Sequence, residues 1–172
     1  MGKLFPMPST PQVIVPNRYR VVPRTIFFVF KDDQVLLQKG ALTKKINAGL
    51  WNGLGGHIER GEDIVTAAKR ELNEEAGLVC DSPLLCGTIM IDVHAAEGIL
   101  LFVFGAEGTT FETIGSDEGM LAWHPVKRLP AEQIVDDVPF LIQKTLASMK
   151  SGVPFHLLYS YDVGGNRIVT PQ

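Results

Sequence analysis

The stretch RELNEEAGL, from Arg70 to Leu78, holds three glutamates whose spacing could serve chemistry. Glu71, Glu74 and Glu75 stand at positions i, i+3 and i+4, so a helix would gather them on one face. Gly77 predicts the end of that helix, which places the carboxylates at the negative pole of its dipole. Like charges at this spacing cost about 0.2–0.5 kcal/mol per pair, and acids near a helix C-terminus cost about 0.3–1 kcal/mol.

Two interpretations of this cluster are open at the level of the residues alone. A single glutamate on an exposed helical face is usually just solvated. A hard divalent cation would instead turn each repulsion into an attraction, and an all-oxygen ligand set favours Mg²⁺, Mn²⁺ or Ca²⁺ over zinc. In proteins, Mg²⁺ is usually held by a few carboxylates together with substrate phosphates. The clustering therefore favours a metal site that a phosphorylated ligand completes.

The segment from Gly56 to Leu78, GHIERGEDIVTAAKRELNEEAGL, resembles the complete Nudix box. That box is a glycine, five residues, a glutamate, seven residues, an Arg-Glu pair, two residues, a Glu-Glu pair, one residue, a glycine and an apolar residue, and every fixed position is filled here. The resemblance implies a Nudix hydrolase, which cleaves a diphosphate linkage in a nucleoside diphosphate that bears a further group.

The resemblance also implies roles for individual residues. A Mg²⁺ ion, or Mn²⁺ in its place, would be held by three carboxylates and one backbone carbonyl, from Glu71, Glu74, Glu75 and either Gly55 or Gly56. Arg70 would orient a glutamate, and Glu62 would pair with the helix. Glu118, in GSDEG, resembles the distal acidic residue that joins the metals in MutT-like members, although alone it is an ordinary surface acid. Glu71 and Glu118 are the two candidates for the base that takes a proton from the attacking water.

Resemblance outside the box bears on the substrate. The segment Trp51–Glu62, WNGLGGHIERGE, is similar to that of the 8-oxo-dGTP diphosphatases, in which an asparagine after tryptophan contacts the base, and this implies Asn52. Two adjacent aspartates read the purine edge there, and they match Asp136 and Asp137, which could otherwise cap the helix that follows. Ile134-Val135 stands where those relatives have Trp-Pro, and an aliphatic side chain offers no π face to a base.

Two further positions are candidates for contacts with substrate. Phe27 or Phe28 could form one wall of a base pocket, although core packing is the alternative for a phenylalanine in such an apolar run. His57 follows the loop glycines and could touch a phosphate or simply line the loop.

The elements that must position these residues alternate between strand and helix signals. Asp63–Ala76 is predicted to be a helix with the apolar stripe Val65, Ala68, Leu72 and Ala76. The other predicted elements are strands at Gln12–Val15, Thr25–Phe30, 35–39, Leu84–Asp92, Ile99–Gly105, Glu118–Trp123, Phe155–Tyr161 and Arg167–Thr170, with a helix from Pro139 to about Lys150. This order predicts an α+β protein, a Nudix fold with a mixed β-sheet sandwiched by helices (α/β/α).

The 172 residues fit one domain, which we expect at residues 24–172, after a proline-rich N-terminal arm at residues 1–23. Both a monomer and a homodimer fit the sequence. The net charge is −3 and no block of Lys or Arg stands out, so we expect no nucleic-acid duplex and no membrane as partner. Two cysteines without metal spacing are expected to be free thiols, and with no signal peptide the expected location is cytoplasmic.

The sequence thus predicts Mg²⁺-dependent hydrolysis of a nucleoside triphosphate, a small molecule, to its monophosphate and pyrophosphate. The leading substrate is an oxidised purine such as 8-oxo-dGTP. Alternatives within the family are a pyrimidine deoxynucleotide, ADP-ribose or a capped RNA end. A rival of another class is a nucleotide-binding regulator without turnover, but a sensor has no reason to keep a cluster of mutually repelling glutamates.

Overall fold

The computed structural model describes residues 14–43, 46–117 and 119–171. Within them it contains eight strands and two helices. Their bounds are β1 Arg20–Lys31, β2 Gln34–Gly40, β3 Trp51–Asn52, α1 Ile64–Ala76, β4 Leu84–Asp92, β5 Glu97–Glu107, β6 Gly119–Pro125, α2 Val138–Ser151, β7 Phe155–Tyr161 and β8 Arg167–Pro171. Neither helix combines the length and the apolar character of a membrane span in these ranges.

The strands form one mixed sheet in the order β3-β2-β1-β5-β4-β7-β8, and β6 pairs with β2. β1 and β5 are parallel neighbours, as are β4 and β7, while the other pairs are antiparallel. Three antiparallel pairs of consecutive strands, β1–β2, β4–β5 and β7–β8, form hairpins. Asp32 and Asp33 both have positive φ in the first turn, the conformation that a two-residue hairpin requires.

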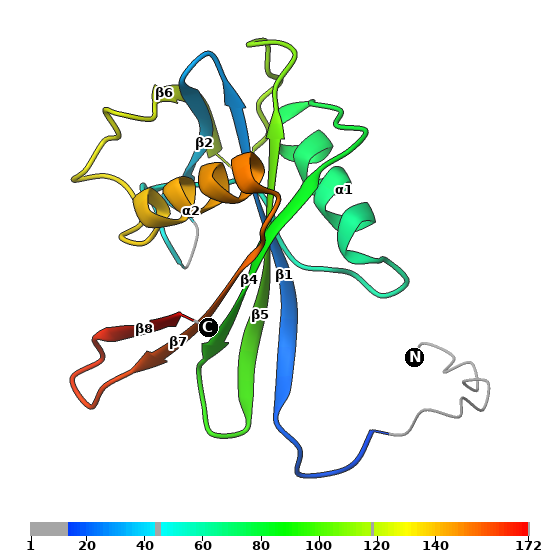
Figure 1. Ribbon diagram of the computed structural model, residues 1–172, viewed down its shortest axis with the longest axis vertical. Coiled ribbons are helices and arrows are strands. Elements are labelled where there is room, and N and C mark those ends of the chain that lie inside the picture. The colour runs from blue at the N-terminus through cyan, green and yellow to red at the C-terminus, as the bar shows by residue number, and fades with distance from the viewer. Residues whose placement is uncertain (1–13, 44–45, 118, 172) are drawn as a thin grey trace.

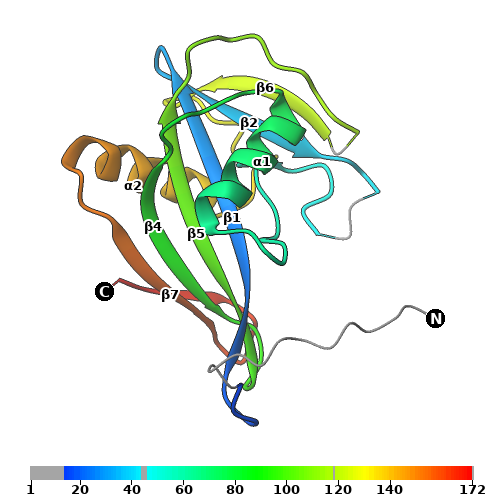
Figure 2. The ribbon, with the colours of Figure 1, turned by 90° about the vertical axis from the view of Figure 1, so that its right-hand side faces the viewer.

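The two helices cover opposite faces of this sheet (Figure 1; Figure 2). Along β1, Phe27 and Val29 pack with α1, whereas Phe28 and Phe30 lie in the core on the α2 side. Because both faces are covered, the strand is apolar at every position from 26 to 30 instead of alternating with polar residues. The predicted α/β/α arrangement is confirmed.

Helix α1 begins and ends where the sequence predicts. Its N-cap is Asp63, whose carboxylate accepts from the amides of Val65 and Thr66. Gly77 ends it in the left-handed conformation, with φ of 65°. The predicted apolar stripe is wrong at one end, because Val65 is exposed and Ala67 is buried in its place. Ile64 packs against the same core, so the face that α1 turns to the sheet begins with Ile64, Ala67 and Ala68.

Three differences from the prediction concern strand ends. β1 starts at Arg20, inside the segment expected to be an arm, and the pair Trp51–Asn52 forms the short strand β3 within an expected loop. The expected strand at Gln12–Val15 lies partly outside the described residues, and Ile14 and Val15 are not in a strand. Division of the chain at residue 23 remains a prediction.

Candidate active site

The glycine segment, residues 53–57, lies alongside β1 and connects β3 to the loop before α1. Phe27 and Leu54 exchange two backbone hydrogen bonds of 2.7 and 3.1 Å, and the Thr25 amide donates to the Gly56 carbonyl at 2.9 Å. Gly55 has φ of +134°, and a Cβ there would overlap the carbonyl oxygen of Thr25. Only glycine allows so close an approach in this conformation.

Two glutamates of α1 meet this segment. The Gly55 amide donates to Glu75 Oε2 at 2.7 Å, and Glu75 is 3% exposed. A Cβ on Gly56 would overlap the carboxylate of Glu71, so that glycine lets the side chain come against the backbone. The last two turns of the helix therefore bring carboxylates directly against the two predicted glycines.

Arg70 binds the remaining carboxylates around the helix. Its Nε and Nη2 donate to the two oxygens of Glu62 at 2.6 and 3.0 Å, and Nη1 donates to Glu71 Oε1 at 2.9 Å and Glu74 Oε2 at 3.0 Å. Nη2 also donates to the His57 carbonyl at 3.1 Å. The hydrogen bond from Arg70 is the main cause of a lowered pKa at Glu62, and the carboxylates in turn raise the pKa of Arg70. The expected pairing of Glu62 with the helix is thus present, and the acids are partly neutralised by a residue of their own helix.

The donor chemistry at this place fits a hard divalent cation. The candidate donors are carboxylate and backbone oxygens, the ligands that Mg²⁺ and Mn²⁺ prefer. In the arrangement described, Glu71 and Glu74 bind Arg70 and Glu75 binds the Gly55 amide, and no three His, Cys, Asp or Glu side chains of the described ranges are placed together as a metal site. Glu74 is the outermost of the three, with a side chain 58% exposed. Glu118 lies outside the described residues.

A cavity of about 510 Å³ opens beside the glycine segment, on the α2 face of the sheet. Its walls are largely aliphatic, from Ile26, Ile91, Ile99, Leu101, Val135 and Leu141. Asn52, His57 and Asp137 supply polar groups, as does Arg24, a lining cation that sequence reasoning missed. Gly53, Gly55 and Gly56 also line it. The cavity and the glutamates therefore share the glycine segment as a common border.

The other predicted substrate contacts are placed differently. Phe28 is fully buried in the core on the α2 side, which agrees with the packing alternative. It lies behind Gly53, where a Cβ would come within 2.9 Å of its ring. Ile134 is buried as well and forms a parallel bridge with Trp51.

The loop before α2 is fastened to β3 through the main chain. The Trp51 amide donates to the Gln133 carbonyl at 2.7 Å, and the Val135 amide donates to the Trp51 carbonyl at 3.0 Å. These two bonds hold the loop that carries Asp137 next to the strand that carries Asn52. Backbone hydrogen bonds therefore fix where Asn52 and Asp137 lie in the cavity wall.

The two adjacent aspartates share an arginine that the sequence analysis did not single out. Arg167, at the start of β8, forms ion pairs with Asp136 Oδ2 at 2.6 Å and with Asp137 Oδ2 at 3.4 Å. Asp137 occupies the N-cap position of α2, but its side chain makes no capping hydrogen bond, so capping does not explain it. Burial raises the pKa of Asp137, and the charge of Arg167 opposes that shift. Two adjacent carboxylates attract a nearby cation, but sequence spacing does not say which one.

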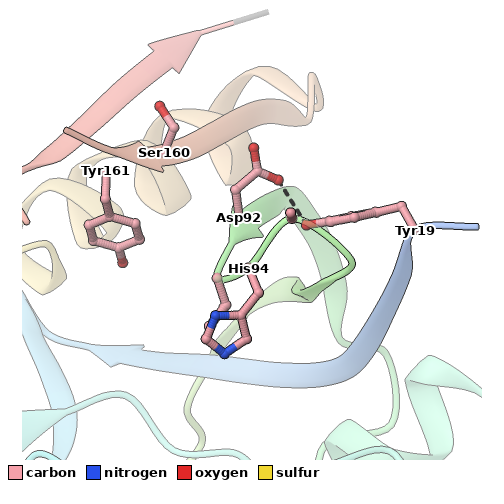
Figure 3. Close-up of a pocket in the computed structure, with 7 residues that line it drawn as sticks. Tyr19, Asp92, His94, Ser160 and Tyr161 are labelled. Carbon is pink, nitrogen blue, oxygen red and sulfur yellow. Dashed lines mark hydrogen bonds between the residues drawn. The ribbon is translucent and has the colours of Figure 1, made fainter. Parts of the chain in front are cut away.

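A second hollow, of about 540 Å³, lies at the far end of the sheet, by the turn between β4 and β5 (Figure 3). Its wall is formed by Tyr19, Asp92, Val93, His94, Ala95, Ser160 and Tyr161. The Tyr19 hydroxyl donates to Asp92 Oδ1 at 2.8 Å, and this bond ties the segment before β1 to the end of β4. None of the predicted site residues lines this hollow, so it is separate from the glutamate cluster.

Comparison with known proteins identifies the family of this chain. A model of the NUDIX domain matches residues 20–143. Oxidized purine nucleoside triphosphate hydrolase of Danio rerio is 34% identical over 125 residues, which cover 70% of this chain and 79% of that protein. The 8-oxo-dGDP phosphatase NUDT18 of Mus musculus is 33% identical over 121 residues, which cover 67% of this chain and 36% of that protein. The MutT protein from Bacillus halodurans has a similar fold, with a TM-score of 0.70 at 23% identity over 88% of this chain and 98% of that one.

The chain therefore belongs to the Nudix family, as the segment from Gly56 to Leu78 predicts, and it is a hydrolase of that family.

Proposed function

We propose that this protein hydrolyses a purine nucleoside triphosphate, with 8-oxo-dGTP as the leading candidate, to the monophosphate and pyrophosphate. The observation that carries the proposal is the shared border of the two parts of the site. Asn52 and the glycine segment line the cavity, while Gly55 and Gly56 contact Glu75 and Glu71. A ligand whose base enters the cavity would bring its phosphates to the carboxylates.

We call the side of the site that carries the three glutamates the polyanion end. Hydrolysis there would depend on Mg²⁺, for which Mn²⁺ can substitute. Glu71, Glu74 and Glu75 would hold it together with one glycine carbonyl. The Gly56 carbonyl already accepts from Thr25, which favours Gly55 for this role. When bound, such an ion neutralises phosphate charge and lowers the pKa of the attacking water.

Side chains of the protein would then position the catalytic glutamate and the phosphates, and one of them would deprotonate the attacking water. Arg70 orients Glu71 through its 2.9 Å hydrogen bond and keeps that side chain against the glycine segment. Glu71 or Glu118 takes the proton from water, and both remain candidates. Arg24 and His57 line the cavity beside the glycines, where a cation and an imidazole can contact phosphate oxygens.

We call the cavity lined by Asn52 and Asp137 the base end. It would recognise a purine by its hydrogen-bonding edge more than by the faces of its rings. Asn52 and Asp137 offer hydrogen bonds from two elements, and the aliphatic walls give shape without a stacked aromatic ring. The named activities of the Danio rerio and Mus musculus relatives support an oxidised purine nucleotide, and the second of them supports a diphosphate as the alternative substrate.

We further propose a cytoplasmic location, because Cys80 and Cys86 are free thiols. Domain 24–172 would act alone or as a homodimer, with small nucleotides as its ligands.

A panel of nucleotides tests the proposal. Oxidised and normal purine triphosphates, 8-oxo-dGDP, a pyrimidine triphosphate, ADP-ribose and a capped RNA would be assayed for phosphate products with Mg²⁺, with Mn²⁺ and with a chelator. We expect metal-dependent release of pyrophosphate, fastest from an oxidised purine triphosphate. Release from ADP-ribose or capped RNA alone would reassign the substrate, and nucleotide binding without any release would favour the regulator.

A further inference from the structure

Arg167 joins three side chains that reach it from different elements. It forms ion pairs with Asp136 and Asp137 on the loop before α2, and its guanidinium carbon lies 5.0 Å from the ring centre of Tyr159 on β7. In the β7–β8 pairing, Val169 faces Tyr159 and Arg167 faces Tyr161, so Arg167 projects from the sheet face that carries the cavity. Two ion pairs and a cation–π contact give this arginine a fixed orientation.

The two aspartates are not equivalent in this cluster. Asp136 is 76% exposed and makes the shorter ion pair, so Arg167 holds it outside the cavity. Asp137 is 15% exposed and lines the cavity, with Arg167 at the longer distance of 3.4 Å. One carboxylate thus faces a ligand, and the other helps to anchor the arginine.

We propose that Arg167 determines the base preference of this site by holding Asp137 as an ionised hydrogen-bond acceptor at the cavity wall. This inference rests on the proposed function, because it assumes that a base occupies the cavity. Arg167 acts through Asp137 and is therefore a positioning residue. A carboxylate accepts only, whereas a carboxylic acid also donates. The pocket then selects a base edge that presents N–H donors, as the edge of a guanine-type base does at N1 and N2.

Several groups of the described residues act on the pKa of Asp137, and Arg167 is the only positively charged one among them. Burial disfavours the carboxylate and raises its pKa, and the neighbouring charge of Asp136 adds to that shift. Arg167 provides the opposing positive charge. Tyr159 faces the same carboxyl from β7, and its own pKa is raised by burial, so it stays neutral. Arg24 and His57 are the other titratable side chains that line the cavity.

Two substitutions should shift the titration of Asp137 in opposite directions. Arg167→Gln removes the positive charge and should move the midpoint to higher pH. Asp136→Asn removes the neighbouring negative charge and should move it to lower pH, while Arg167→Lys should stay near the wild type. The measurement is ¹³C NMR of the side-chain carboxyl signals, with the Asp137 signal assigned by its loss in Asp137→Asn. Arg128→Gln, at an exposed arginine outside the cluster, is the matched control and should not move it.

The second readout is kcat/KM for guanine-type and adenine-type triphosphates across pH. In Arg167→Gln, the guanine-to-adenine ratio should fall by about tenfold, the effect of one hydrogen bond to a charged group. The acid limb of the guanine profile should move to higher pH, which loss of folding alone would not produce.

The two hypotheses fail separately. A wild-type enzyme that releases no phosphate from any triphosphate rejects the proposed function, and the NMR titration still decides the role of Arg167. An Asp137 midpoint that is unchanged in Arg167→Gln rejects the inference, whatever the activity. If Arg167→Gln does not fold, Asp136→Asn carries the decision, and an unmoved or raised midpoint there overturns the proposal.

Discussion

The site has two ends, and an arginine organises carboxylates at each of them. At the polyanion end, Arg70 binds Glu62, Glu71 and Glu74, which all lie within eight residues of it in the sequence. At the base end, Arg167 reaches back to two aspartates that precede it by thirty residues or more. The first cluster is built by one helix and the loop before it, whereas the second exists only because β7 and β8 return beside the start of α2.

This difference separates two jobs. A cluster within one helix keeps its geometry wherever the helix packs, and this suits a reaction that is common to a whole family. A cluster between distant elements can change with a single substitution in either of them, and this suits substrate choice. Substitutions at the polyanion end should therefore lower the rate of hydrolysis. Substitutions at the base end should change which nucleotide is preferred while hydrolysis continues.

The largest expected effect is at Glu75. We predict that Glu75→Gln lowers kcat by more than about tenfold, because the neutral amide weakens the grip on a cation while keeping the size of the side chain. Steady-state kinetics with Mg²⁺ would measure this, with Glu112→Gln, an exposed acid outside the site, as the control. Equal kcat values for the two variants would show that Glu75 has no role in catalysis.

Gly55 tests whether the polyanion end depends on backbone packing. Gly55→Ala should lower the free energy of unfolding by about 1–3 kcal/mol from backbone strain alone, and the overlap with Thr25 adds to that cost. Gly115→Ala is the control, since its Cβ would meet nothing within 4 Å. Urea unfolding compares the two, and equal midpoints would contradict the close approach.

Asp137 tests the opposite expectation for the base end. Asp137→Ala should change the ranking of purine triphosphates by about tenfold in kcat/KM, because an unpaired polar edge in the cavity is costly. The kcat on a triphosphate that the pocket does not read should change much less. Identical rankings for the variant and the wild type would show that the base is recognised elsewhere.

The smallest effect concerns pH and Glu62. Its pKa is lowered in the folded state from an ordinary value of 4.5, chiefly by its hydrogen bond from Arg70. The stabilisation is therefore complete above that value and is lost as the pH falls through the folded pKa. Wild-type unfolding free energy should decline more steeply than that of Glu62→Gln below about pH 4.5. Parallel curves from urea titrations at pH 7, 5, 4 and 3 would show that the ion pair contributes nothing.

The same contrast explains what the sequence could predict. The bounds of β4 and β7 and the cap of α1 follow from local periodicity and single residues, so they match the structure. The packing of Glu71 and Glu75 against the glycines is also local to the box. Arg167 was missed because its partners are set by strand pairing, which no spacing encodes.

Other differences have a similar cause. Phe28 offered a plausible aromatic wall, but its strand is covered on both faces and the ring points into the core. The stripe of α1 begins with Ile64 and Ala67 in place of Val65, because Ile64 and Val65 are both apolar and periodicity alone does not say which one packs on the core. Arg24 faces the cavity only because the glycine segment runs beside β1.

The two main-chain bonds of Trp51 to the loop before α2 give the site a fixed internal length. In the proposed function, the cavity wall that would contact a base and the glycine segment that would border a metal belong to one continuous piece of hydrogen-bonded backbone, which limits how far their separation can change. The enzyme would then act as a ruler for its ligand: nucleotides are accepted or refused by the reach from base to scissile bond, before any individual contact is tried.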